Sequence, residues 1–505
     1  LDACADVPAL MSEVPAPSDP KVRQEIAALH TQLSRAAAYR LAGRPNDGWK
    51  IADAAVTAAR HTGDTAILAE TLAEAGQAQL GLDPMKAVTL LQEAFGAAFS
   101  SHLDRVATNA AVRLMAAYTL TARKTEAALW ERYAQAGLRR IGGDDELEAE
   151  LWMARGHGFE EAGRYDQVYD AYAHAERLVE HKYGPDDMRT LRSQNNVVLA
   201  LTNDHRVLEA RPLRAALLQR QQAALGGHHP VVARTLGEVS VSDVQLGILD
   251  EAHADLARSM QILRDTGVDG NTRTWMVTLY EDMALAVTEG RMADGAADAR
   301  KILAMLDGWS MADSEVAYET RAFLARAQLG LGQVAEATLM LRTTLAQLEK
   351  SHGKDNVIAG PILSALADAC ARAGHGDEAL DLMRRDVAIM VSQSGEGSFD
   401  VAEARIDLAR LLTAHGQAAD GLALATANEA PLLRGVGEGG PDVIMARLAR
   451  GEALVALGRH AEAAALLDPA VATAAREKLD PALRKLLDTA AAKAHAHNTV
   501  SARAN

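Results

Sequence analysis

Residues 329–337 read Leu329-Gly330-Leu331-Gly332-Gln333-Val334-Ala335-Glu336-Ala337, and here a glycine separates two runs of helix-forming residues. Gly332 has no Cβ, so it tolerates the left-handed backbone conformation that ends a helix. Ala337 stands five residues later and is small enough to let two antiparallel helices approach closely. This stretch therefore predicts a tight turn between two packed α-helices.

The same turn recurs along the chain, because Gly332, Gly374, Gly416 and Gly458 follow one another at 42-residue intervals. Earlier turns stand at Gly163, Gly247 and Gly290, and His205 fills the missing place. The small residue five positions on recurs at Ala210, Ala252, Gly295, Ala379, Gly421 and Ala463, with Val168 as the larger exception. A second glycine series follows about half a period later, from Gly184 to Gly437. Each repeat is therefore expected to be helix A, a tight turn, helix B and a loop.

These signals predict an all-α, right-handed superhelical α-solenoid of about eleven helix pairs plus a C-terminal capping helix. The first three pairs are less regular, with turns near Gly43, Gly81 and Ala122. Four prolines within residues 1–20 disfavour helix there. We expect five segments: a Pro-rich linker or strap (1–20), three irregular pairs (21–143), eight regular pairs (144–478), the capping helix (479–494) and a disordered tail (495–505).

Composition excludes several classes of partner. The 505 residues are 49% hydrophobic but only 4% aromatic, and 52 Lys and Arg against 68 Asp and Glu give a net charge of −16. Because the basic residues form no cluster, binding to nucleic acid or to anionic lipid is disfavoured. No uninterrupted apolar run reaches the roughly 18–20 residues that span a bilayer, so this chain is not expected to insert into a membrane.

A family resemblance adds detail to the repeat. Residues 226–236, Gly-Gly-His-His-Pro-Val-Val-Ala-Arg-Thr-Leu, resemble the loop and helix of the 42-residue tetratricopeptide (TPR) repeats of kinesin light chains. Asn195-Asn196 also falls where those repeats carry paired asparagines on helix A. The resemblance covers roughly residues 144–478, and it implies TPR-type helix pairs that hold another protein.

A second resemblance concerns the first helices. Cys4-Ala5-Asp6-Val7, the segment 15–20 (Pro-Ala-Pro-Ser-Asp-Pro) and the segment 36–44 (Ala-Ala-Ala-Tyr-Arg-Leu-Ala-Gly-Arg) look like the extracatalytic TPR region of myxobacterial-type serine/threonine protein kinases. This implies a sensory or docking module of a membrane-anchored bacterial kinase, with the repeats in the periplasm. The alternative is a free-standing, cytoplasmic, kinesin-light-chain-like adaptor. The chain begins at Leu1 and not at Met, so we expect a fragment or processed form.

The sequence offers no residues for catalysis. The kinase motifs are absent, so any kinase activity would lie before Leu1, and we expect this chain not to be an enzyme. The run Gly435-Val436-Gly437-Glu438-Gly439-Gly440 follows a helix and precedes Pro441, which indicates a loop between repeats and not a dinucleotide site. No cysteine or histidine pattern has metal-ligand spacing, so neither metal nor cofactor is expected. Cys4 and Cys370 stand at opposite ends of the array, so no disulfide between them is expected unless the superhelix brings those ends together, and Cys370 is expected to be buried.

A partner is expected in the concave groove, which helix A of each repeat faces. Counting nine, ten and thirteen positions back from each turn gives the candidates Arg192, Asn195, Asn196, Arg234, Glu238, Tyr280 and Glu281, with Asp407 in a later repeat. An asparagine can bind a peptide backbone as donor and acceptor, and an arginine can hold a carboxylate in forked geometry. The expected partner is a protein or peptide, and self-association is a further option for such a scaffold.

Overall fold

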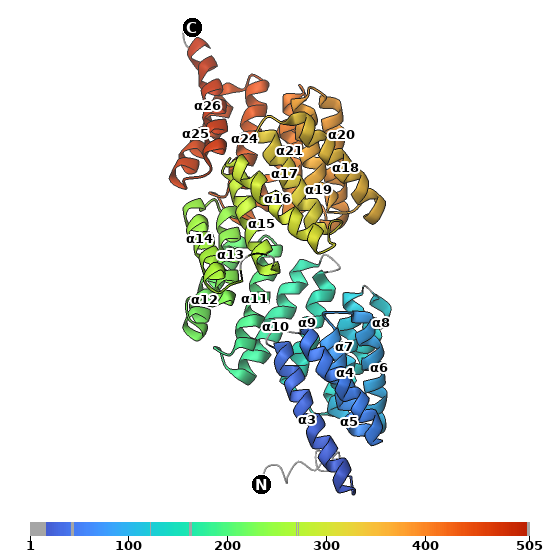
Figure 1. Cartoon of the computed structure of the whole chain (residues 1–505). Helices are drawn as coiled ribbons and strands as arrows, with labels where there is room; N and C mark the ends of the chain where they lie inside the picture. The colour runs from blue at the N-terminus through green and yellow to red at the C-terminus, as the bar shows by residue number, and fades with distance from the viewer. Residues whose placement is uncertain are drawn as a thin grey trace. The chain divides into compact units, whose positions relative to one another are not determined.

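The computed structural model describes residues 17–41, 45–121, 123–160, 164–268, 270 and 272–501. Within them the chain forms 24 α-helices and no strand, which confirms the expected all-α class (Figure 1). The chain divides into two compact units, Leu1–Ala200 and Leu201–Asn505. The expected turns at Gly43, Ala122 and Gly163, the linker residues 1–16 and Cys4 lie outside the described residues.

Unit 1 consists of helix pairs in which each helix packs on the next. Its helices are α3 (Pro20–Leu41), α4 (Pro45–Thr62), α5 (Thr65–Gln79), α6 (Pro84–Ser100), α7 (Asp104–Leu120), α8 (Lys124–Arg140), α9 (Asp145–Glu160), α10 (Tyr165–Tyr183) and most of α11 (Met188–Asn203).

Unit 2 continues the same pattern. Its helices are α12 (Val207–Leu225), α13 (Pro230–Gln245), α14 (Leu249–Asp265), α15 (Arg273–Thr288), α16 (Met292–Gly308), α17 (Glu315–Gly330), α18 (Val334–His352), α19 (Ala359–Arg372), α20 (Gly376–Ser394), α21 (Phe399–Ala414), α22 (Ala418–Ala427), α23 (Glu429–Val436), α24 (Pro441–Ala456), α25 (His460–Arg476) and α26 (Pro481–Ser501). The described helices thus form eleven pairs and a capping helix, as expected.

Local chemistry fixes where the helices begin and end. Hydroxyl groups cap several helix starts: Ser398 accepts a hydrogen bond from the backbone N–H of Val401 at 3.3 Å. Proline occupies the first position of α13 and α24, where its missing N–H costs nothing. The turn glycines adopt the left-handed conformation, as at Gly332 with φ +80°. The spacing seen in the sequence therefore reflects a backbone requirement.

Replacing Gly332 by Ala is expected to lower the free energy of unfolding by about 1 kcal/mol, since a Cβ is strained at this φ. Gly308→Ala is the matched control, because Gly308 is helical and a Cβ there would meet nothing within 4 Å. The control is expected to leave stability unchanged or slightly raised. Urea unfolding followed by circular dichroism measures both, and equal losses would contradict the assigned role of the turn glycine.

Stacking of the pairs creates the core. In the middle of unit 2, Tyr318 of α17 and Leu341 of α18 pack with Ile362 of α19 in one cluster, and all three side chains are fully buried. Each pair is too small to bury its apolar side alone, so successive pairs share their cores.

Two details differ from the expected regularity. Helix B of the tenth pair is broken into α22 and α23, because the ring of Pro431 conflicts with the carbonyl of Ala427, four residues earlier, where α22 ends. The expected end of the capping helix at residue 494 is wrong, because α26 continues to Ser501. Residues 495–501 of the expected disordered tail are therefore helical.

Candidate functional site

In unit 1 the first helix of each pair lines a groove. Two adjoining cavities, of about 480 and 350 Å³, share Arg113 of α7. Their walls come almost entirely from α3, α5, α7, α9 and α11, the A helices of the first five repeats. This surface corresponds to the groove that the sequence predicts for a partner.

The counting rule from the sequence places groove residues correctly in three successive A helices. Positions nine and thirteen before the turn line the cavities on α7, α9 and α11; they are Arg113 and Asn109, Ala154 and Glu150, and Asn196 and Arg192. The A helices therefore present equivalent positions to the groove, as a regular stack requires.

Buried polar atoms without partners lie on an apolar floor in this groove. Leu80, Val112, Ala116, Met153 and Val179 supply apolar wall. Four polar atoms in the groove are buried and accept or donate no hydrogen bond: Gln77 Oε1, Asn109 Oδ1, Arg113 Nε and Ser193 Oγ. Ser193 is only 6% exposed. Native proteins pair nearly all such groups, so these four atoms leave hydrogen-bonding capacity unused in the groove.

The arginines of the groove differ in how they are neutralised. Arg40 Nε lies 3.3 Å from Glu74 Oε1, and Arg113 Nε lies 3.6 Å from Glu150 Oε2. Burial lowers the pKa of Arg113 below its ordinary value. Arg192 is exposed and has no ion-pair partner among the residues that the structure describes. One guanidinium at the edge of the groove is thus available to an anionic group.

Asn195 and Asn196, the other candidates on α11, lie in different environments. Asn196 lines the groove, and its Nδ2 approaches Met153 Sδ at 3.8 Å. Asn195 is 5% exposed and faces the packing between helices, with Oδ1 unpaired. Arg192 and Asn196 thus line the groove, whereas Asn195 is buried between helices, and the binding role of all three stays a prediction.

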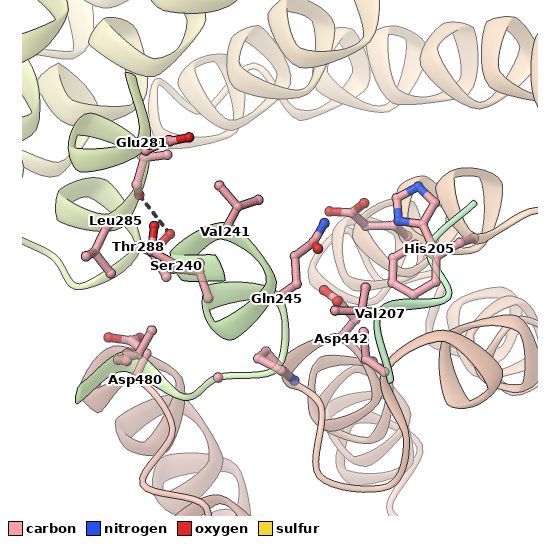
Figure 2. Close-up of a pocket in the computed structure, with 18 of the residues that line it drawn as sticks. His205, Val207, Ser240, Val241, Gln245, Glu281, Leu285, Thr288, Asp442 and Asp480 are labelled. Carbon is pink, nitrogen blue, oxygen red and sulfur yellow. Dashed lines mark hydrogen bonds between the residues drawn. The ribbon is translucent and has the colours of Figure 1, made fainter. Parts of the chain in front are cut away.

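Unit 2 contains a second cavity, of about 430 Å³, lined by A helices and by residues from both ends of the unit. Figure 2 shows Gln245 of α13, Glu281 of α15 and Asp442 of α24 around this space. Phe323 and Arg326 of α17 add an aromatic ring and a guanidinium. Arg326 also lines an adjoining cavity of about 500 Å³ together with Asp407.

Acidic groups dominate the inner face of unit 2. Burial and the charge of Glu238 raise the pKa of Glu281 to about 8. Burial and the charges of Asp442 and Asp407 likewise raise the pKa of Glu403 to about 8. The pKa of Asp442 is raised to about 6, mainly by burial. Glu281, Glu403 and Asp442 have no ion-pair partner within the part of the chain that the structure describes, so the shift of each favours its neutral form.

The remaining candidates in unit 2 are mostly engaged with their neighbours. Arg234 pairs with Glu238 at 3.8 Å, one helical turn away. Tyr280 donates a hydrogen bond to Glu319 Oε2 at 3.1 Å, and its ring contacts Phe323 edge to face at 5.7 Å. Tyr280 is thus engaged with neighbouring side chains, whereas Glu281 lines the inner cavity. A partner-binding role for either residue stays a prediction.

Sequence reasoning missed the groove residues of the irregular repeats. Arg113 and Asn109 stand at the predicted positions before Ala122, so the same counting would have found them. In the second repeat Gly81 is misleading, since it does not adopt the left-handed conformation of a turn glycine. Gln77 and Ser193 carry no sequence signal that separates them from other helix residues.

Two searches within the described residues gave no site of another kind. None of the described helices is long and apolar enough to span a membrane. No group of three His, Cys, Asp or Glu residues in the described part could hold a metal ion. Cys370 is buried, with 1% exposure.

No protein-family model matches the chain, and no curated protein matches it. Solved structures with TPR-type repeats do resemble it. TPR-like repeats of a kinesin light chain-like protein from Podosopora anserina are 21% identical, cover 41% of this chain and 97% of that one, and give a TM-score of 0.34.

Two further solved structures resemble the chain over a larger share of its length. The Rap protein complexed with competence and sporulation factor is 10% identical, covers 69% of this chain and 98% of that one, and gives a TM-score of 0.46. A signal transduction ATPase with a tetratricopeptide repeat sensor from Pyrococcus horikoshii is 10% identical, with a TM-score of 0.48; the match covers 73% of this chain and 53% of that one. These similarities are low, so the fold is assigned from the helix pairs themselves, and no activity of these proteins is assigned to this chain.

Proposed function

We propose that this chain is a protein-interaction scaffold, and that the groove of unit 1 holds an extended segment of a partner protein. The observation that carries the proposal is the row of unpaired polar atoms on the apolar floor. It lies on the face that five successive A helices share.

The polar atoms match the main chain of a peptide. A buried polar atom without a partner costs about 1–3 kcal/mol. An extended peptide presents N–H and C=O groups along its length, so Gln77 Oε1, Asn109 Oδ1 and Ser193 Oγ can each gain a partner. Apolar side chains of the same segment can cover Val112, Ala116 and Met153. Binding would thus remove an existing cost of the free protein.

The charged groups of the groove indicate which side chains a partner would carry. Arg192 is exposed beside the groove without an ion-pair partner among the described residues, whereas Arg40 and Arg113 contact acids. A carboxylate on the partner can form a forked pair with Arg192. We therefore propose an acidic side chain or chain end next to the apolar part of the segment.

The wider assignment to a kinase stays a prediction from the resemblance of the first helices, as does the alternative of a free-standing adaptor. Both use the array as an interaction module. Reading the coding sequence ahead of Leu1 distinguishes them. A kinase domain with an apolar span supports the first and a periplasmic location, while an initiator Met immediately before Leu1 supports the second and a cytoplasmic one.

Selection of short random peptides displayed on phage tests the groove directly. Peptides enriched on the whole chain are expected to lose about tenfold in affinity on the variant with Arg192→Glu and Asn196→Ala, measured by fluorescence polarisation. The control is Arg132→Glu, an exposed residue on α8, which lies outside the groove. If no peptide is enriched, or if enriched peptides bind both variants equally, the proposed groove is wrong.

A further inference from the structure

His205 occupies a turn position where the following repeats have glycine. Its φ is +53°, in the left-handed region, as are Gly247, Gly290 and Gly332 in the equivalent places. A residue with a Cβ is strained there by about 1–2 kcal/mol. The backbone at His205 is therefore strained, whereas a glycine at this turn would not be.

The imidazole of His205 contacts residues that are distant from it in the sequence. Its ring stacks on Phe399 of α21 with centroids 4.3 Å apart and planes 5° apart. Nε2 lies 2.7 Å from Oδ1 of Asp400. The fit around it is tight, because a Cβ on Gly435 would come within 2.7 Å of the carbonyl oxygen of His205. The His205 turn thus joins the start of unit 2 to the tenth helix pair of the chain.

A second contact lies one repeat further on. Lys478 is another non-glycine residue with positive φ, +54°, and its Nζ lies 3.3 Å from Asp250 Oδ2. The turn at Gly247 leaves no room for a side chain, since a Cβ would come within 2.2 Å of Leu479. Between the two contacts, Val207 is fully buried in a cluster with Ala402, Ile406, Val436 and Val443.

Together these contacts bring the first and last repeats of unit 2 against each other. The unit is therefore a closed ring, and the cavity of about 430 Å³ lies where the ends meet, lined by His205 and Gly247 from one end and by Phe399 and Asp442 from the other.

We propose that the contacts of His205 with Phe399 and Asp400 form a releasable clasp that closes unit 2 into a ring. Release of this clasp opens the inner face of unit 2 to a polypeptide segment of a partner. The joining surface consists of one small apolar cluster, the His205 ring on Phe399 with its Asp400 contact, the packing of Leu479 against Gly247, and an exposed ion pair worth about 0–1 kcal/mol. These few contacts keep the closed and open states close in free energy.

The test replaces His205 by Gly, which restores the residue of the other turns and so preserves the fold. Spin labels on Ala216→Cys of α12 and Arg434→Cys of α23, both exposed positions on two contacting helices, report closure. Cys4→Ser and Cys370→Ala remove the native thiols. Electron–electron double resonance is expected to give a short, narrow distance distribution for the His205 chain, and a longer, broader one for His205→Gly.

Access to the inner face is measured separately. Ser240 lines the cavity and is only 2% exposed, so Ser240→Cys is expected to react slowly with a maleimide on a long polyethylene glycol chain while the ring is closed. The reaction is expected to accelerate about tenfold in His205→Gly, since 1.4 kcal/mol changes an equilibrium tenfold. His102→Gly is the matched control, because His102 has φ +58° but lies in unit 1.

Three results would overturn the clasp: a broad distribution in the chain with His205, identical distributions in both chains, or equal reaction rates. Only the occupant of the opened face rests on the proposed scaffold function. None of these measurements uses a partner, so their failure would leave the groove of unit 1 untouched. Conversely, failure of the phage selection would leave the ring intact.

Discussion

Replacing Arg113 by Met together with Glu150 by Gln is expected to weaken binding in the groove of unit 1 by about 2–5 kcal/mol, while raising the free energy of unfolding by about 1–3 kcal/mol. The side chain of Arg113 is only 11% exposed, and its Nε contacts Glu150 at 3.6 Å without a hydrogen bond. The free protein therefore keeps a charge that is poorly compensated. Opposite changes in binding and stability would show that this charge serves the ligand.

The control removes the same kind of pair elsewhere. Arg60 Nη2 lies 2.7 Å from Glu93 Oε2, and both side chains are about half exposed, on α4 and α6. Arg60→Met with Glu93→Gln is expected to change stability by less than about 1 kcal/mol and leave peptide affinity unchanged. Thermal unfolding and fluorescence polarisation with a selected peptide measure both pairs. If the Arg113 variant loses stability and keeps its affinity, Arg113 is a structural residue.

The helix pairs could be predicted because their cause is local. A turn whose backbone adopts φ near +80°, as at Gly332, favours glycine. In a regular stack this glycine recurs every 42 residues. Irregular turns leave a weaker mark. Gly81 suggested a turn residue although its backbone does not need glycine, which displaced the counting in the second repeat.

The groove could be predicted only in part. Neighbouring residues on a helix point about 100° apart, so of two adjacent candidates one faces the groove and the other the core. The pair Asn195-Asn196 does not reveal which is which, and the structure turns Asn196 outward and Asn195 inward. Tyr280 and Glu281 divide in the same way. In both cases the residue nine positions before the turn is the one that faces the cavity.

The sequence contains one sign of the closure of unit 2, but the structural cause of that sign could not be deduced from the sequence. His205 interrupts the glycine series, which shows that something at this turn outweighs backbone strain. Its partners Phe399 and Asp400 are far away in the sequence and lie outside the repeat pattern. Periodicity predicts contacts between neighbouring repeats, but it does not predict a contact between the fifth and the tenth.

Removing two inner carboxyl groups of unit 2, with Glu281→Gln and Glu403→Gln, is expected to raise the free energy of unfolding by about 3 kcal/mol at pH 9 and by almost nothing at pH 4.5. Burial raises the pKa of each group to about 8, whereas a glutamate in an unfolded chain titrates near about 4.3. The folded state therefore binds protons more tightly than the unfolded state. This contribution is fully present below about pH 4.3 and is lost as the pH rises through about 8.

The size of the effect follows from the same shift, reduced because Glu403 keeps contact with solvent inside the cavity. Urea unfolding of the parent chain and the double variant at pH 4.5, 7 and 9 gives the difference, in which all other titrating groups cancel. Glu336→Gln is the control, since Glu336 is exposed on α18 and lies outside these cavities. A difference that stays constant across this range, or that shrinks as the pH rises, would mean that the acids of the inner face are already neutralised by their surroundings.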